Sequence, residues 1–244
     1  MDRPTPEVPA AAVGRSITKL YRKYEDKDIY IFGCGPSLFQ IDPERFRDEV
    51  CFGINFAFEA MPHIDWHFAH VIETYEAMKK VVDPAKMILP ETLVRQWNRG
   101  QQPILPNRIA PDSPKSYIYP IQDPYSKLLT SKSTAIEKDT SIFTWSCTTH
   151  SAIHLAAYMG AKNIYLVGVD YKPFPGGHTH FESKHLPSYG EQSWNAMSKH
   201  RKGDHWLANE LKKQGVNVIN LSQKTMAARK PIQRVRRTKP SYKR

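Results

Sequence analysis

The sequence is poor in cysteine and lacks any long apolar run. Its 244 residues contain three widely spaced cysteines, Cys34, Cys51 and Cys147. So few and so widely separated thiols argue against a disulfide framework and against a zinc site built on paired thiolates. No run of about 18 apolar residues is present, so no membrane-spanning helix is expected. Residues 1–16 carry acids and prolines instead of the apolar core of a secretory signal, and we therefore expect a cytoplasmic protein with reduced thiols.

Acidic residues are missing from the C-terminal segment, which is strongly basic. Residues 229–244 contain eight Lys and Arg side chains and no Asp or Glu, and they leave only about +3 of the net charge of +11 to the rest of the chain. A nucleic-acid-binding domain would be basic over its folded body. We predict that residues 223–244 form a flexible tail. It could touch an anionic membrane surface at the inner face of the membrane, less readily nucleic acid, or serve only solubility.

Strand and helix patterns alternate through the middle of the chain. With 40% apolar residues the chain can form one core, which we place at residues 15–222, after a disordered segment at 1–14. The predicted strands cover 28–32, 51–58 (a strand together with its exit), 64–70, 86–90, 162–170 and 216–222. The predicted helices cover 15–28, 73–82, 146–161 and 203–215, and residues 42–50 are predicted to form a short helical or turn segment. This alternation predicts an α/β protein with a single Rossmann-like, doubly wound, mainly parallel sheet.

Two stretches break the alternation. Residues 98–141 are rich in proline, and residues 171–200 are rich in glycine, proline and histidine. Irregular stretches of this length in a compact domain are usually functional or mobile. We predict that both act as mobile lid or acceptor-binding segments.

The segment after the first predicted strand carries a glycine-rich turn, Gly33-x-Gly35-Pro36-Ser37. It lacks the third glycine of a dinucleotide-binding fingerprint, because Leu38 stands there, and it has no P-loop lysine. Glycine permits a positive φ and the close approach of a ligand, and a helix start favours an anion. The turn therefore predicts a ligand site of a less common kind, with an ordinary tight turn as the alternative.

Further polar residues follow other predicted strands. Asn55 follows the second strand and Asp170 ends the fifth, and in parallel sheets ligands bind beyond the carboxyl ends of the strands. The sequence Ser-Cys-Thr-Thr-His at 146–150 opens a helix, where free amides suit a phosphate or carboxylate. The alternative for 146–150 is simple helix capping by a hydroxyl group.

No metal site is predicted. The Asp26-x-Asp28 pair precedes the first strand, at the end opposite the ligand edge, and is interpreted as surface. His178 and His180 have no clear carboxylate or thiolate partner at a suitable spacing. The numerous histidines instead offer a general base, because imidazole titrates near neutrality.

Four short islands resemble the bacterial sialyltransferases of glycosyltransferase family 42. They are 30-YIFGCGPSLFQID-42, 52-FGINFAF-58 with Asn55, 160-GAKNIYLVGVDY-171, and the C-terminal helix with its preceding histidine. The glycine-rich turn also resembles that of a Rossmann-like family that includes an archaeal pterin pyrophosphokinase and motility-associated proteins. The sialyltransferase resemblance implies a GT-A-like variant of the fold and metal-independent transfer of sialic acid from a CMP-sugar to a glycan.

The resemblance also implies roles for individual residues. The residues matched to the donor site are Gly33, Cys34, Gly35, Pro36, Ser37, Asn55, Thr148, Thr149, Asp170, Tyr171, His178 and His180. His200 is nearest the family's catalytic histidine, with His205 as the alternative. The chain departs from the family at Cys34, where the family has an asparagine, and in the tyrosines that contact the donor phosphate.

The sequence therefore predicts a bacterial or phage glycosyltransferase that needs no cofactor. It would transfer a sialic acid or a similar acidic sugar from a CMP-sugar, whose single phosphate needs no bridging metal, to a glycan hydroxyl. Two alternatives remain: a pyrophosphokinase-like nucleotide enzyme on the same frame, and a non-enzymatic nucleotide- or nucleic-acid-binding protein. The sequence indicates neither the acceptor nor the oligomeric state.

Overall fold

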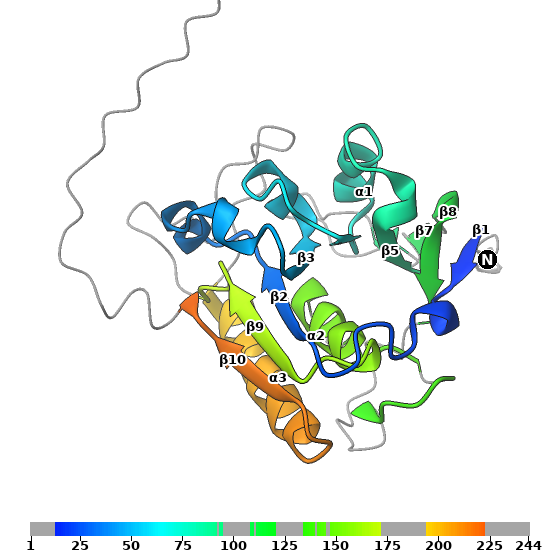
Figure 1. Ribbon diagram of the computed structural model, residues 1–244. Helices are drawn as coiled ribbons and strands as arrows, with labels where there is room; N and C mark the ends of the chain where they lie inside the picture. The colour runs from blue at the N-terminus through cyan, green and yellow to red at the C-terminus, as the bar shows by residue number, and fades with distance from the viewer. Residues whose placement is uncertain are drawn as a thin grey trace, which may run out of the picture.

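An eight-stranded sheet, parallel throughout, organises the protein (Figure 1). The computed structural model describes residues 13–91, 93–94, 108–109, 111–120, 134–139, 141–144, 147–171 and 194–222. The strands of the sheet are β1 (Val13–Ser16), β2 (Asp28–Phe32), β3 (Val50–Ile54), β4 (Trp66–Phe68), β5 (Met87–Pro90), β8 (Asp112–Tyr119), β9 (Asn163–Val167) and β10 (Asn217–Asn220). A separate antiparallel pair joins β6 (Leu93–Val94) to β7 (Arg108–Ile109). The predicted Rossmann-like α/β architecture is confirmed.

The strand order is β1-β8-β5-β4-β3-β2-β9-β10. From β2 the chain proceeds outward through β3, β4 and β5, and later returns to the other side of β2 with β9 and β10. Ile29 of β2 therefore lies between Val50 of β3 and Ile164 of β9. The order reverses between β2 and β9, and such a reversal is where open parallel sheets bind ligands.

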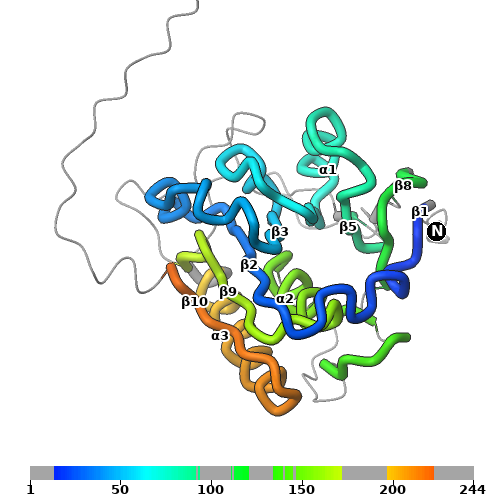
Figure 2. The backbone as a smooth tube through the Cα atoms, in the orientation of Figure 1, coloured from blue at the N-terminus to red at the C-terminus, as the bar shows by residue number. Residues whose placement is uncertain are grey.

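Alternating side chains of the strands supply two different cores. Ile29, Ile31 and Ile164 pack on the face covered by α2 (Thr148–Tyr158) and α3 (Trp194–Lys212). These two helices lie side by side (Figure 2). Phe32 and Val167 pack on the opposite face. That face is covered by the 3₁₀ helices η2 (Pro36–Gln40), η3 (Pro43–Phe46) and η4 (Asn55–Glu59) and by α1 (Ile72–Met78).

Three predictions about elements are wrong. Instead of a helix over 15–28 the chain forms β1 and then the 3₁₀ helix η1 (Ile17–Leu20). Within the predicted irregular stretch 98–141, β8 joins the main sheet; Pro114 is tolerated because the pairing of β8 with β1 shifts register around it. Helix α3 begins at Trp194, inside the predicted irregular stretch 171–200. Gly203, which we took as a helix start, is an interior residue of α3.

Several predicted features lie outside the described residues. They are the disordered N-terminus up to residue 12, the basic tail from 223, most of both lid segments, and His178 and His180. Among the helices that the structure describes, none combines the length and apolar character needed to cross a membrane. The other bounds differ from the predicted ones by a few residues, except that the segments at 42–50 and 55–59 are 3₁₀ helices. The small 3₁₀ helix η5 (Pro84–Lys86) precedes β5.

Candidate functional site

The glycine-rich turn packs against the chain that leaves β9. The amide of Gly33 donates to the Val167 carbonyl oxygen at 2.8 Å, and that of Gly35 donates to the Gly168 oxygen at 2.6 Å. The amide of Ser37, in the first turn of η2, donates to Oδ2 of Asp170 at 2.8 Å. The two most specific islands of the sequence are therefore bonded to each other at the reversal point of the sheet.

The sequence suggested that the glycines of the turn permit a positive φ and the close approach of a ligand, but the structure gives a different reason for them. Gly35 has φ −69°, which any residue can adopt. A Cβ at Gly35 would lie 2.5 Å from the Gly168 oxygen and would also strike the Asp170 carboxylate, and one at Gly33 would lie 2.6 Å from the Gly168 oxygen. These positions are glycine because the exit of β9 lies against them. Gly168 itself has φ +69°, a conformation that favours glycine.

Asp170 acts as an internal anion for the turn. It is 6% exposed, and its carboxylate accepts a hydrogen bond from the amide of Ser37, one of the residues that the resemblance matched to the donor site. Ser37 is itself fully buried, and its hydroxyl has no hydrogen-bond partner among the described residues. Cys34 is buried as well: its thiol donates to the Ile54 oxygen at 3.2 Å, and burial raises its pKa to about 12.

Two residues at the carboxyl ends of strands adopt left-handed backbone conformations. Asn55, after β3, has φ 53°, and Tyr171, after β9, has φ 50°. Asparagine tolerates this region, whereas for a tyrosine it is costly, and such residues cluster at functional sites. Both residues are half-buried, and Oδ1 of Asn55 and the hydroxyl oxygen of Tyr171 are buried atoms.

The start of α2 is the third part of this edge. Because α2 leads into β9 and runs against it, its first turn lies at the carboxyl ends of the strands, as predicted (Figure 1). Cys147 is the N-cap residue and makes no side-chain capping bond. Thr148 is buried and Thr149 half-buried. The first amides of a helix have no partner within the helix and favour anions.

Burial divides the predicted donor-binding residues into two groups. The residues that build the frame from inside are Gly33, Cys34, Gly35, Ser37, Thr148 and Asp170. The described residues that retain exposed surface for a ligand are Pro36, Asn55, Thr149 and Tyr171.

The two candidate bases lie on one helix but differ in their surroundings. His200 is within α3, not on a loop before it, and its ring centroid lies 6.4 Å from that of His150 on α2. Its carbonyl oxygen lies 3.1 Å from Nε2 of His150. His205 is exposed. His200 therefore faces α2, and the N-terminal half of α3 brings it toward the same end of the sheet, because α3 leads into the parallel strand β10.

Other histidines near this edge are buried and neutral. Burial, reinforced by Lys86, lowers the pKa of His67 to about 4. Burial lowers the pKa of His70 to about 3, and its Nε2 lies 2.5 Å from the Tyr119 hydroxyl. Asp28, by contrast, binds Asn163 at 2.8 Å at the amino ends of β2 and β9, so the Asp26-x-Asp28 pair is remote from the ligand edge.

The sequence did not predict one group of neighbouring side chains. Cys147, His150 and Asp204 come together between α2 and α3. The spacing Cys-x-x-His at a helix start was visible in the sequence. Asp204 lies 54 positions further on, and only the packing of α3 against α2 brings it near.

The comparisons with known proteins include a similarity in structure. No family model and no curated protein matches the sequence. A solved structure of the MAf glycosyltransferase from Magnetospirillum magneticum AMB-1 is similar with a TM-score of 0.49 and 14% identity, over 88% of this chain and 36% of that chain. The present chain thus spans about a third of that protein's length. A likeness of this degree concerns the fold and does not identify a function.

Proposed function

We propose that the protein is a glycosyltransferase that transfers a sialic acid or similar acidic sugar from a CMP-sugar to a glycan hydroxyl. The supporting observation is the contact between Ser37 and Asp170, which joins the two sequence islands most similar to the sialyltransferases at the point where the strand order reverses. Asn55 and Thr149 follow on the same edge. The similarity in overall fold is too weak to bear on this proposal.

In this proposal the buried residues hold the frame and the half-buried ones touch the donor. The amide side chain of Asn55 would bind a hydroxyl or base edge of the nucleotide. The phosphate would lie at the start of α2, where Thr149 offers a hydroxyl and the first-turn amides offer partial positive charge. The glycine-rich turn would shape the pocket wall and leave anion binding to α2, because Asp170 already takes its amide.

The chemistry needs a stabilised leaving group and a base. As the glycosidic bond to CMP breaks, the phosphate gains charge, which the helix start would stabilise. His200 would accept the proton of the acceptor hydroxyl. A monophosphate leaving group needs no Mg²⁺ or Mn²⁺ to bridge two phosphates, and neither ion is part of the proposal.

A binding experiment tests the proposal directly. Calorimetry with CMP, UMP, AMP and CMP-sialic acid should show selective binding of the cytidine nucleotides without added Mg²⁺. Transfer to a labelled galactoside would then be measured, and its rate should not rise when Mg²⁺ or Mn²⁺ is added. If the protein bound ATP only in the presence of Mg²⁺ and had no affinity for CMP, the pyrophosphokinase alternative would replace the proposal.

Asn55 offers a variant that separates binding from folding. Asn55→Gly removes the side chain yet suits the positive φ of this position, so the backbone strain falls. We expect CMP affinity to drop about 10-fold, the value of one neutral hydrogen bond. The melting temperature should stay close to that of the parent protein. An unchanged CMP affinity would remove Asn55 from the site.

A further inference from the structure

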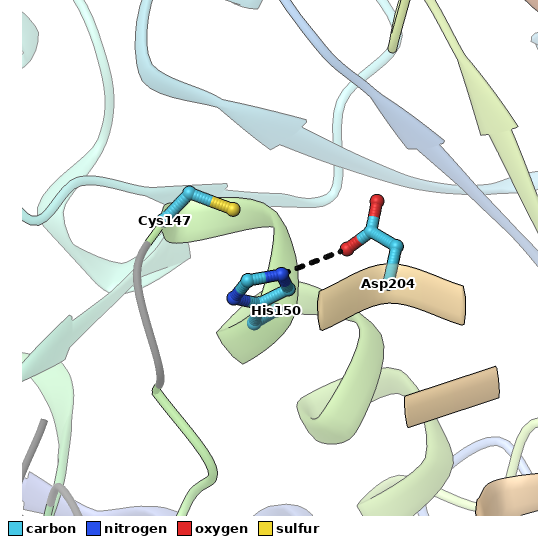
Figure 3. Close-up of side chains that lie close together, drawn as sticks. All are labelled: Cys147, His150 and Asp204. Atoms are coloured by element: carbon cyan, nitrogen blue, oxygen red, sulfur yellow. Dashed lines mark ion pairs between the residues drawn. The ribbon is translucent and has the colours of Figure 1, made fainter. Parts of the chain in front are cut away.

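The group of Cys147, His150 and Asp204 has the composition of a metal site. Cys147 is the N-cap residue of α2, His150 lies one turn later on that helix, and Asp204 projects from the neighbouring α3 (Figure 3). One potential ligand atom from each residue lies within 4.8 Å of the other two. No other group of this kind occurs in the part of the chain that the structure describes.

Asp204 is buried in a way that calls for a cation. It is 7% exposed, and neither carboxylate oxygen accepts a hydrogen bond from a described residue. Its nearest charged neighbour is His150, whose Nε2 lies 3.2 Å from Oδ1, a contact within ion-pair distance but not aligned as a hydrogen bond. Buried carboxylates are normally hydrogen-bonded, paired or bound to metal, because desolvation of the charge is costly.

The separation of the two groups fits shared coordination. Zinc binds imidazole nitrogen at about 2.0–2.1 Å and carboxylate oxygen at about 2.0–2.2 Å, so tetrahedral ligands of these types lie roughly 3.3 Å apart. The observed distance between Nε2 of His150 and Oδ1 of Asp204 is 3.2 Å. Without metal, a proton on Nε2 of His150 can be donated to the carbonyl oxygen of His200, 3.1 Å away. A metal ion bound at Nε2 would replace that proton.

We propose that Cys147, His150 and Asp204 bind a zinc ion through one thiolate, one imidazole and one carboxylate. Zinc accepts these donors together, whereas Mg²⁺ and Ca²⁺ require oxygen ligands. Three protein ligands leave a fourth tetrahedral position, as in zinc sites that bind water or substrate. Cys147 is half-exposed and precedes Thr148 at the edge formed by the carboxyl ends of the strands.

The zinc proposal is independent of the proposed glycosyl transfer and can be tested without any substrate. The full chain, free of any histidine tag, would be stripped with a chelator and titrated with Zn²⁺. We expect one zinc per chain by elemental analysis and a rise in melting temperature on binding. With Co²⁺ in place of Zn²⁺, a thiolate-to-cobalt charge-transfer band would report the Cys147 ligand.

Variants assign the ligands. Cys147→Ser and Asp204→Asn should each weaken zinc affinity by more than about 100-fold, because loss of even an outer partner of a ligand costs about 10–100-fold. His63→Ala, which removes a histidine on the other face of the sheet, should leave affinity unchanged. Circular dichroism of each zinc-free variant would verify folding. Zinc bound with equal affinity by Cys147→Ser, or no zinc bound by the parent chain, would overturn the proposal.

Alkylation kinetics separate the metal site from a reactive thiol. The same three groups could activate Cys147 as a nucleophile, since cysteines at helix starts beside histidine are often thiolates. If the site binds zinc, added Zn²⁺ should slow iodoacetamide labelling of Cys147 at least about 10-fold, in line with thiolate ligation. Rapid labelling that Zn²⁺ does not change would show an activated thiol and contradict zinc binding.

Discussion

The Ser37 amide and the Asp170 carboxylate, 133 positions apart in sequence, are joined by a hydrogen bond of 2.8 Å. The bond ties the turn after β2 to the turn after β9, across the point where the strand order reverses. The carboxylate thereby takes the place that a bound anion has in many nucleotide-binding turns.

Replacing Asp170 should loosen this junction. Asp170→Ala leaves the buried Ser37 amide unpaired, and we expect a loss of about 1.5–3 kcal/mol in the free energy of unfolding, the range for hydrogen bonds to charged groups. Asp170→Asn keeps an acceptor oxygen and should lose less. Urea denaturation of the three proteins checks the order. Equal stability of the alanine and asparagine variants would argue against the role of this bond.

Substitution of Gly35 should destabilise the fold rather than only weaken ligand binding. A Cβ there meets the backbone oxygen of Gly168, which cannot move without disturbing β9. Overpacking of this kind costs about 1–3 kcal/mol, so the melting temperature of Gly35→Ala should fall by roughly 2–12 °C. Ser37→Ala is the matched control in the same turn, because it removes a buried hydroxyl without adding volume. Equal melting temperatures of Gly35→Ala and Ser37→Ala would contradict the steric argument.

The proposed base can be distinguished from its neighbour on α3. His200 faces His150 on α2, and His205 is exposed. Loss of a general base costs about 10²- to 10⁴-fold in kcat with little change in donor affinity. We expect this from His200→Ala and a near-parental rate from His205→Ala. Steady-state kinetics, with CMP affinity measured separately, would identify the base. If His205→Ala were inactive and His200→Ala active, the role of general base would belong to His205.

Buried histidines should make the protein sensitive to mild acid. Burial lowers the pKa of His67 and that of His154 to about 4, and His154 Nδ1 accepts the Phe143 amide at 2.8 Å. The unfolded chain binds these protons near pH 6.5 and the native state only near pH 4. Stability from these groups is therefore complete above about pH 6.5 and is lost as the pH falls toward 4, by about 1.4 kcal/mol per pH unit for each histidine.

Urea denaturation at several pH values checks this window. His67→Gln removes one of the buried histidines with a lowered pKa and should flatten the fall in stability between about pH 6.5 and about pH 4.5. His63→Gln controls for the removal of a histidine elsewhere. A slope that His67→Gln leaves unchanged would mean that this histidine does not titrate differently in the two states.

Six of the eight strands of the main sheet and their parallel arrangement followed from the sequence, because buried runs such as 163–167 alternate with helices and such patterns specify a parallel sheet. The 3₁₀ helices were harder to predict, since Pro36 and Pro43 begin segments too short for helical periodicity. Strand β8 was hidden by Pro114, which the irregular pairing with β1 accommodates.

The candidate site was predictable only where local pattern sufficed. The rule that ligands bind at carboxyl ends of strands correctly grouped the glycine-rich turn, Asn55 and Asp170 on one edge. It could not reveal that the glycines make room for Gly168, or that Asp204 approaches Cys147, because both contacts join distant parts of the chain.

During synthesis β2 cannot complete its pairing until β9 has been made, because β9 lies much later in the chain. β2 leaves the ribosome before β9, its partner on one side, which is not made until residues 163–167 appear. Likewise β1 must wait for β8, about 100 residues later, as the Arg15–Lys115 contact illustrates. Until then one edge of β2 exposes unpaired amides and carbonyls, which invite association with other chains. The nascent protein should therefore depend on chaperones until α2 and β9 have left the ribosome, when the turn after β2 first meets Asp170.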